Sequence, residues 1–195
     1  MLILLKELHR DDVMTKQLAR FLSANGIEVN IICFGDKENS YTLEEEGQKY
    51  ATVHTVTLMV HADNLFNWTM LMNNELKKRG RQLFDEHDYD IIHGNDWMTA
   101  PAAMTLKKYT KKPLVMTINS TEHERGFGGV HGSMISDLEW WSGFEADHII
   151  VNKKSTLESL KHDLKIPQDK LSLISGDSWC DKVLEIYFLV TKVDR

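Results

Sequence analysis

Short apolar runs alternate with longer segments of helical spacing along this chain of 195 residues. The first run, Leu2–Leu5, is continuously apolar, as expected for a strand that is buried on both faces of a sheet. Strands that alternate with helices pair in parallel, because each helix carries the chain back to the start of the next strand. The pattern therefore predicts an α/β fold with a doubly wound, mostly parallel sheet.

Apolar density and periodicity also place the individual elements. Strands are expected at residues 2–5, 27–34, 51–59, 89–93, 113–118, 149–151 and 170–174, and helices near 18–22 and at 65–84, 101–109, 133–146 and 155–164. The polar and acidic segment Gly35–Lys49 is expected to be a surface excursion. Residues 1–175 are predicted to form one Rossmann-like domain and residues 176–195 a C-terminal tail. Within the tail, Lys182–Asp194 fits either an added strand or a helix docked on the sheet.

The charge and the cysteine content exclude several classes of protein. The net charge is -6, so the positive field that attracts nucleic acid is missing. Cys33 and Cys180 are far apart, which indicates neither a disulfide framework nor a zinc ribbon and fits a reducing compartment. No apolar run approaches the ~20 residues that cross a bilayer, and no basic segment precedes the short opening run. We expect a cytoplasmic protein whose partners include neither nucleic acid nor a membrane.

The first candidate site lies where a predicted strand gives way to a helix. Ligands of doubly wound sheets bind beyond the carboxyl ends of the strands, so His93 and Asp96 are expected to face such a crevice. The structural alternative for Asp96 is that it caps backbone amides while Trp97 packs under the helix. The sequence leaves both roles open.

A second polar turn follows the strand expected at 113–118. It supplies amide, hydroxyl and charged side chains that fit a polar pocket: Asn119, Ser120, Thr121, Glu122, His123, Arg125 and His131. The glycines after Arg125 would let a loop close over that pocket, although their spacing departs from the dinucleotide-binding pattern. Asn119 and Glu122 have a spacing similar to that of a helix capping box, which is the structural alternative.

A metal site built on His93, Asp96, His123 and His131 is not favoured. The chain contains nine histidines, so chance proximity is expected, and no pair has the one-turn helical spacing of a zinc hydrolase. We therefore expect neither a metal nor another cofactor.

Several motifs occur together between Asp90 and Ile174. In order they are the His-x-x-Asp-Trp turn at 93–97, the Thr-Ile-x-Ser-Thr-Glu turn at 117–122, Glu139, and the Ala-Asp entry to a strand at 146–147. This segment resembles the N-terminal acceptor domain of the glycogen/starch synthase-like retaining glycosyltransferases, and residues 2–33 are collinear with it. The resemblance implies the N-terminal lobe of a glycosyltransferase-B fold, a nucleotide-diphosphate sugar donor, and a sugar or glucan acceptor.

The resemblance also implies which residues form the site. Asn119 occupies the position of a family histidine, and an amide cannot exchange a proton near neutral pH, although it can bind a sugar hydroxyl. The loop Lys6–Met14 is shorter than in the family and lacks its glycine pair. By analogy the catalytic positions are Asn119 and Asp96. The substrate-binding positions implied by the family are His93, Ser120, Thr121, Glu122 and Arg125.

Beyond Ile174 the family continues into a donor-binding lobe, which residues 175–195 do not match. The leading hypothesis is therefore an acceptor domain that transfers sugar only when a second lobe or subunit supplies the donor site. The alternative from another class is a degenerate or truncated copy that acts as an interaction module in a homo- or hetero-oligomer. A nucleotide-binding Rossmann protein of different chemistry and a fragment of a longer protein are two further readings.

Overall fold

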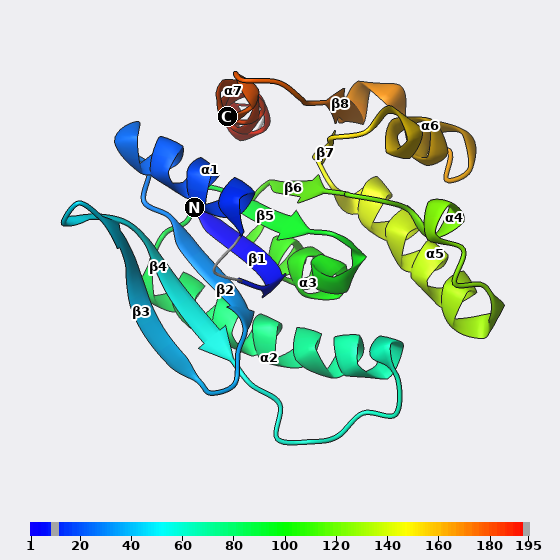
Figure 1. The fold of residues 1–195 in the computed structure, drawn as a ribbon, viewed down its shortest axis with the longest axis horizontal. Coiled ribbons are helices and arrows are strands. Elements are labelled where there is room, and N and C mark those ends of the chain that lie inside the picture. Colours follow the sequence, from blue (N-terminus) through cyan, green and yellow to red (C-terminus); the bar gives the residue numbers. More distant parts are fainter. Residues whose placement is uncertain (9–11, 193–195) are drawn as a thin grey trace.

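The strands are β1 (Leu2–Glu7), β2 (Asn30–Phe34), β3 (Asn39–Glu45), β4 (Gln48–Val56), β5 (Ile92–Asn95), β6 (Leu114–Thr117), β7 (His148–Val151) and β8 (Leu171–Leu173). In the computed structural model, which describes residues 1–8 and 12–192, they form one sheet in the order β3-β4-β2-β1-β5-β6-β7-β8 (Figure 1). Every neighbouring pair is parallel except β3 and β4, which are antiparallel. The predicted α/β class is confirmed.

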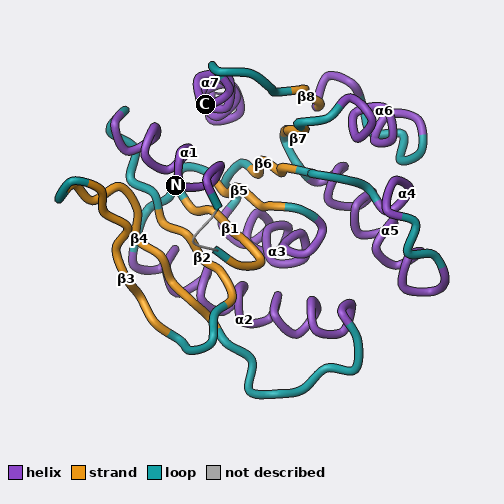
Figure 2. Tube along the Cα trace, in the orientation of Figure 1, coloured by secondary structure: helices purple, strands orange, loops and turns teal. Residues whose placement is uncertain are grey.

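Helices cover both faces of this sheet (Figure 2). They are α1 (Val13–Ala24), α2 (Leu65–Glu86), α3 (Ala100–Thr110), α4 (Glu122–Arg125), α5 (Gly129–Glu145), α6 (Lys154–His162) and α7 (Trp179–Lys192), with short 3-10 turns at Trp97–Thr99 and Gln168–Lys170. Leu2 and Leu4 pack in one core cluster with α2 and α3, whereas Ile3 and Leu5 pack in the other with α1 and α7. Successive strand residues point to opposite faces, so one apolar run supplies both clusters, and the sheet is doubly wound as predicted.

The prediction of a surface excursion over Gly35–Lys49 was wrong in part. This segment contains β3, which forms a hairpin with β4 through a two-residue turn at Glu46 and Gly47. Both turn residues have positive φ, 50° and 78°, as a tight hairpin turn requires. Because nearly every residue of β3 is exposed, the strand lacks the alternation of apolar and polar residues that would have revealed it.

The C-terminal tail is a helix, which resolves the alternative left open by the sequence. Five residues on one face of α7 are buried against the sheet: Cys180, Val183, Ile186, Tyr187 and Val190. Asp194, at the end of the predicted segment, lies outside the described residues, as do residues 9–11 of the loop after β1. No helix among the described residues is both long and apolar enough to pass through a lipid bilayer.

The order of the strands in the sheet determines where a binding site is expected. The chain builds the sheet in one direction from β1 through β2 to β4, and in the other from β5 to β8, so the order reverses between β1 and β5. At such a switch point the connections leave in opposite directions and open a crevice beyond the carboxyl ends of the two strands.

Gly94 of β5 allows the sheet and α3 to approach closely, and we expect Gly94→Ala to destabilise the fold. A Cβ at this position would lie 2.5 Å from Met116 Sδ and 3.0 Å from Ala103 Cβ. The thioether can move but the Ala103 methyl cannot, so overpacking should lower the free energy of unfolding by about 1–3 kcal/mol. Urea denaturation measures the loss. A double-mutant cycle with Ala103→Gly should show favourable coupling, and simple additivity of the two substitutions would contradict the explanation.

Candidate functional site

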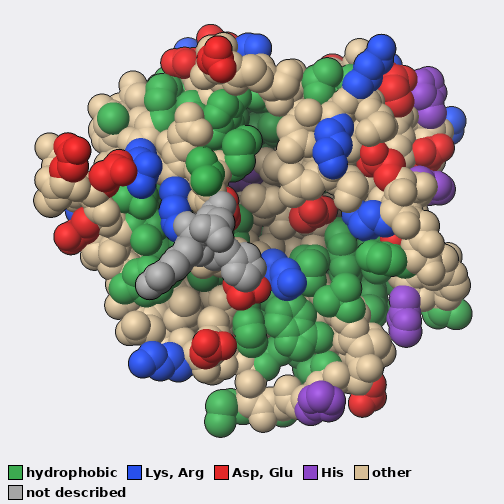
Figure 3. All heavy atoms as spheres, in the orientation of Figure 1, with side chains coloured by type: hydrophobic (Ala, Val, Ile, Leu, Met, Phe, Trp, Pro, Cys, Tyr) green, Lys and Arg blue, Asp and Glu red, His purple; other side chains and the backbone are tan. Residues whose placement is uncertain are grey.

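Two adjoining hollows open beyond the carboxyl ends of the central strands. The apolar cavity, of about 360 Å³, lies between α1 and α7 and is walled mainly by Ile3, Leu18, Ile150, Ile174, Trp179 and Val183. The polar pocket, also of about 360 Å³, lies beside it and includes Lys6, Glu7, Asp12 and Asp96. Four residues line both hollows: Met14, Thr15, Asn95 and Asn119. Together the hollows form one crevice, and Figure 3 shows this face of the molecule hollowed near its centre.

Asp96 stands in a strained backbone conformation at the end of β5. Its φ of 64° and ψ of 170° lie in a region that residues other than glycine rarely adopt. The conformation is held because Asp96 N donates to Thr117 O at 2.7 Å and Trp97 N donates to Asp96 Oδ1 at 3.1 Å. Trp97 is buried, so the capping and packing roles weighed for this pair are both present. The other carboxylate oxygen of Asp96 is directed toward the turn after β6.

Asn119, in the turn after β6, contacts the Oδ2 atom of Asp96. Its Nδ2 lies 3.2 Å from Asp96 Oδ2 and 3.3 Å from Asn95 Oδ1, as donor to both. Burial raises the pKa of Asp96, while the hydrogen bonds from Asn119 and Trp97 and the charge of Arg125 oppose that shift. The pairing brings together the two residues predicted to be catalytic.

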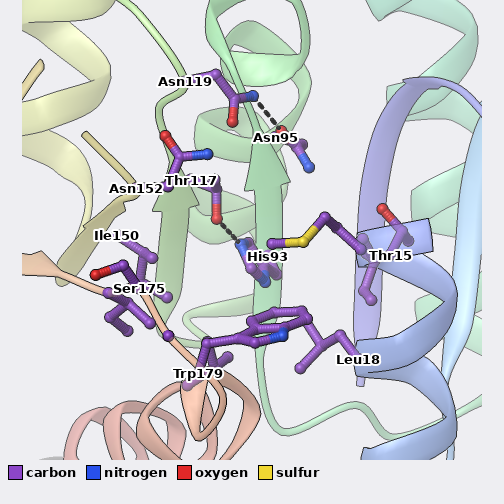
Figure 4. Close-up of a pocket in the computed structure, with 15 residues that line it drawn as sticks. Thr15, Leu18, His93, Asn95, Thr117, Asn119, Ile150, Asn152, Ser175 and Trp179 are labelled. Atoms are coloured by element: carbon purple, nitrogen blue, oxygen red, sulfur yellow. Dashed lines mark hydrogen bonds between the residues drawn. The ribbon is translucent and has the colours of Figure 1, made fainter. Parts of the chain in front are cut away.

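His93 lies at the base of the apolar cavity and is fully enclosed. Its Nε2 lies 2.7 Å from Thr117 Oγ1, and its Nδ1 lies 2.5 Å from the Tyr187 hydroxyl on α7. Burial lowers the pKa of His93 to about 4, so the ring is neutral near pH 7. In Figure 4 the side chains of Leu18 and Trp179 lie on one side of His93. His93 and Thr117 both line the cavity, and both ring nitrogens of His93 already have partners.

The remaining predicted residues form a linked turn beside the crevice. Arg125 donates to Ser120 O and Oγ and pairs with Glu139, a fully buried residue of α5. Glu122 N donates to Glu139 Oε2 at 2.7 Å, and Glu122 Oε1 accepts from Gly128 N at 3.0 Å. These contacts tie α4 to α5. The described residues that line the two hollows include none of the four predicted here: Ser120, Thr121, Glu122 and Arg125.

The capping arrangement differs from the one suggested by the sequence. The reciprocal cap is formed by Thr121 and Glu124, with Thr121 N donating to Glu124 Oε2 at 2.9 Å, rather than by Asn119 and Glu122. The Thr121 hydroxyl is buried and lies 2.7 Å from Ser159 Oγ on α6. This frees the Asn119 side chain for the crevice. His123 and His131 are exposed, and across the described ranges 1–8 and 12–192 no three His, Cys, Asp or Glu residues are grouped as a metal site would need.

Sequence reasoning missed several lining residues. They are Asn95, Thr117, Asn152, Ser175 and Trp179. The first three follow or end strands β5, β6 and β7, so their place at the carboxyl ends was the signal that could have found them. Trp179 lines the apolar cavity only because α7 docks beside the sheet.

A family model, Glycosyltransferase Family 4, matches residues 12–176, which include Asp96, Asn119 and most of the crevice. The chain belongs to glycosyltransferase family 4. This family 4 domain is 32% identical over 163 residues to an uncharacterized glycosyltransferase of Methanocaldococcus jannaschii, covering 82% of this chain and 40% of that protein. It is 28% identical over 96 residues to glycogen synthase of Mycobacterium tuberculosis, covering 45% and 23% respectively. The chain thus spans less than half the length of these curated relatives.

Solved structures share the fold of the family 4 domain. A sucrose-phosphate synthase chain from Thermosynechococcus elongatus superposes with a TM-score of 0.70 at 16% identity and covers 100% of this chain and 99% of that chain. The HepE protein of Anabaena, in complex with UDP and glucose, superposes with a TM-score of 0.59 at 12% identity, covering 90% of this chain and 44% of that one. The resemblance seen in the sequence is thus confirmed at the level of a glycosyltransferase-B N-terminal domain.

Proposed function

We propose that this chain is the acceptor-binding lobe of a retaining glycosyltransferase of the glycogen/starch synthase-like kind, and that a sugar or glucan acceptor binds in the crevice. The observation that carries the proposal is the pairing of Asp96 and Asn119 at the ends of adjacent strands, at the switch point of the sheet. The strained backbone of Asp96 supports a functional role, because such conformations cluster at binding and catalytic sites.

The two residues play different parts in this proposal. Asp96 accepts a hydrogen bond from the acceptor hydroxyl, and its raised pKa makes the ionised carboxylate a stronger proton acceptor. Asn119 orients that hydroxyl but exchanges no proton. Ser120 is half-buried beside Asn119, and its hydroxyl accepts from Arg125. Thr121, Glu122 and Arg125 hold the turn in place, and His93 positions Thr117 through their hydrogen bond.

Transfer would need a donor-binding lobe or subunit in addition to this chain. Among its described lining residues, the polar pocket has one cation, Lys6, against the carboxylates of Glu7, Asp12 and Asp96. A nucleotide diphosphate is an anion that requires concentrated positive charge or backbone amides. The crevice therefore suits the uncharged acceptor, and the donor's diphosphate is expected to be held elsewhere.

Calorimetric titration with maltooligosaccharides, and with methyl glucoside, mannoside and galactoside, tests acceptor binding. We expect Asp96→Asn to lower the affinity for whichever saccharide binds by about 10- to 100-fold, because a charged hydrogen bond in a desolvated site is lost. Asp137→Asn, which changes an exposed carboxylate on α5, is the matched control and should leave the affinity unchanged. Equal affinity of the wild-type protein and Asp96→Asn would rule out the assigned role.

An interaction module is the second candidate, because α5 exposes three large aromatic side chains. Trp140, Trp141 and Phe144 are 47%, 54% and 44% exposed. Apolar groups gathered on one surface are typical of protein–protein contacts. Failure of every saccharide to bind, together with a stable homodimer or hetero-complex in sedimentation velocity, would favour this second function over the first.

A further inference from the structure

The wall of the apolar cavity is unusual for a site that receives only sugar. Seven of its fifteen lining residues are aliphatic, aromatic or methionine, and these come from β1, α1, β7, the segment after β8, and α7. A sugar carries hydroxyl groups around its ring, and each one buried against such a wall would lose its hydrogen bonds to water. This part of the crevice is therefore better suited to an apolar group.

The polarity of the crevice changes along its length. Asn95 and Asn119 stand where the apolar cavity meets the polar pocket, and Asp96 lies just beyond them. Figure 4 shows Asn95 at the end of its strand, Asn119 above it, and Trp179 at the other side of the cavity. A molecule that placed a hydroxyl at Asp96 could extend its remainder along Leu18 and Trp179.

We propose that the acceptor is amphipathic, with a hydroxyl-bearing polar head at Asp96 and Asn119 and an apolar chain or ring in the cavity between α1 and α7. The inference rests on the proposed acceptor site and specifies its substrate class. The cavity volume of about 360 Å³ is in the range of small-molecule sites, which are mostly apolar with a few placed polar groups. The exposed positions of Met14, Asn152 and Ser175 leave its mouth open to solvent.

Calorimetry with matched pairs of glycosides tests this substrate class. Methyl and hexyl glycosides of glucose, mannose and galactose are titrated below the micelle concentration of the hexyl compounds. We expect a hexyl glycoside to bind at least about tenfold more tightly than its methyl partner, because the added methylene groups leave water. The binding heat capacity should also become more negative, which is the marker of apolar burial.

Substitutions in the cavity wall separate its contribution from that of the polar head. Trp179→Ala should reduce the advantage of the hexyl over the methyl glycoside to less than threefold. Trp141→Ala, an exposed position on α5, is the matched control and should keep the full advantage. Met14→Gln provides a second test and should likewise reduce the advantage of the hexyl glycoside. Met14 is 52% exposed, so this substitution should leave the fold intact.

The outcomes distinguish this inference from the function on which it rests. Methyl glycosides or maltooligosaccharides that bind without any gain from the hexyl group would overturn the amphipathic acceptor and leave the acceptor site standing. Failure of all saccharides and glycosides to bind would overturn the proposed function itself. Flotation with phosphatidylcholine vesicles, with and without a monoglucosyl diacylglycerol, identifies the source of the amphiphile. Retention only on the glucolipid vesicles assigns the apolar part to a lipid, and hexyl binding without retention assigns it to a small amphiphile.

Discussion

Glu139→Ala is expected to lower the free energy of unfolding by about 3–5 kcal/mol, the range typical when one partner is removed from a buried ion pair. The Glu139 side chain is fully buried, and its two oxygens accept from Arg125 Nη2 and Glu122 N. Alanine would leave a guanidinium that is only 18% exposed without this carboxylate, and a buried backbone amide without an acceptor. The turn from Ser120 to Gly128 would lose its attachment to α5.

Guanidinium chloride denaturation measures this change. Glu145→Ala, which removes an exposed carboxylate at the end of the same helix, is the matched control and should change the free energy by less than about 0.5 kcal/mol. Glu139→Gln keeps an acceptor for Glu122 N, so its loss should be smaller than that of Glu139→Ala. Similar small losses for Glu139→Ala and Glu145→Ala would show that the buried pair does not hold the turn.

Acidification is expected to destabilise the protein through two buried histidines. Burial lowers the pKa of His93 to about 4, and burial together with the nearby Arg79 charge lowers the pKa of His54 to about 4. In the unfolded chain each ring takes up a proton near pH 6.5, whereas in the folded protein it stays neutral until about pH 4. Their stabilising contribution is therefore complete above about pH 6.5 and is lost as the pH falls. Each histidine should contribute a slope of roughly 1.4 kcal/mol per pH unit between these limits.

Urea unfolding of the wild-type protein and His93→Gln from pH 7 to pH 4 isolates one of these contributions. Burial raises the pKa of Asp96 and of Glu139, and these groups act with the opposite sign, so the difference between the two proteins is the quantity to compare. We expect that difference to diminish toward pH 4. Tyr187→Phe removes the partner of Nδ1 but keeps the imidazole, so its curve should retain the wild-type slope. Parallel curves for the wild-type protein and His93→Gln would contradict this account.

The buried strands were predictable because burial on both faces leaves a clear signature. Continuous apolar runs fill residues 2–5 of β1 and 149–151 of β7, and both strands have helices on each side. β3 gave no such signal, because an exposed edge strand can be polar at every position. In α7 the run at residues 186–190 is continuously apolar, so strand and helix periods fit it equally well. Only docking shows that Ile186 and Tyr187 are buried while Phe188 and Leu189 remain exposed.

The candidate site was predictable to the extent that it depends on strand ends. Asp96 and Asn119 follow adjacent parallel strands, so their proximity is implied once the fold is known. The partner of Arg125 was not predictable, because Glu139 is fourteen positions away on another helix and the pairing depends on how α4 and α5 cross. Trp179 could not be placed either, since its position depends on tertiary docking of α7.

The apolar cavity joins parts of the chain that are synthesised at different times. Ile3 and Leu18 on one side emerge from the ribosome long before Trp179 and Val183 on the other. Domains fold as their segments become available, so the strands from β1 to β7 can pair while the sheet face that α7 later covers is still open to solvent. Ligand binding in the apolar cavity therefore has to await the synthesis and docking of α7.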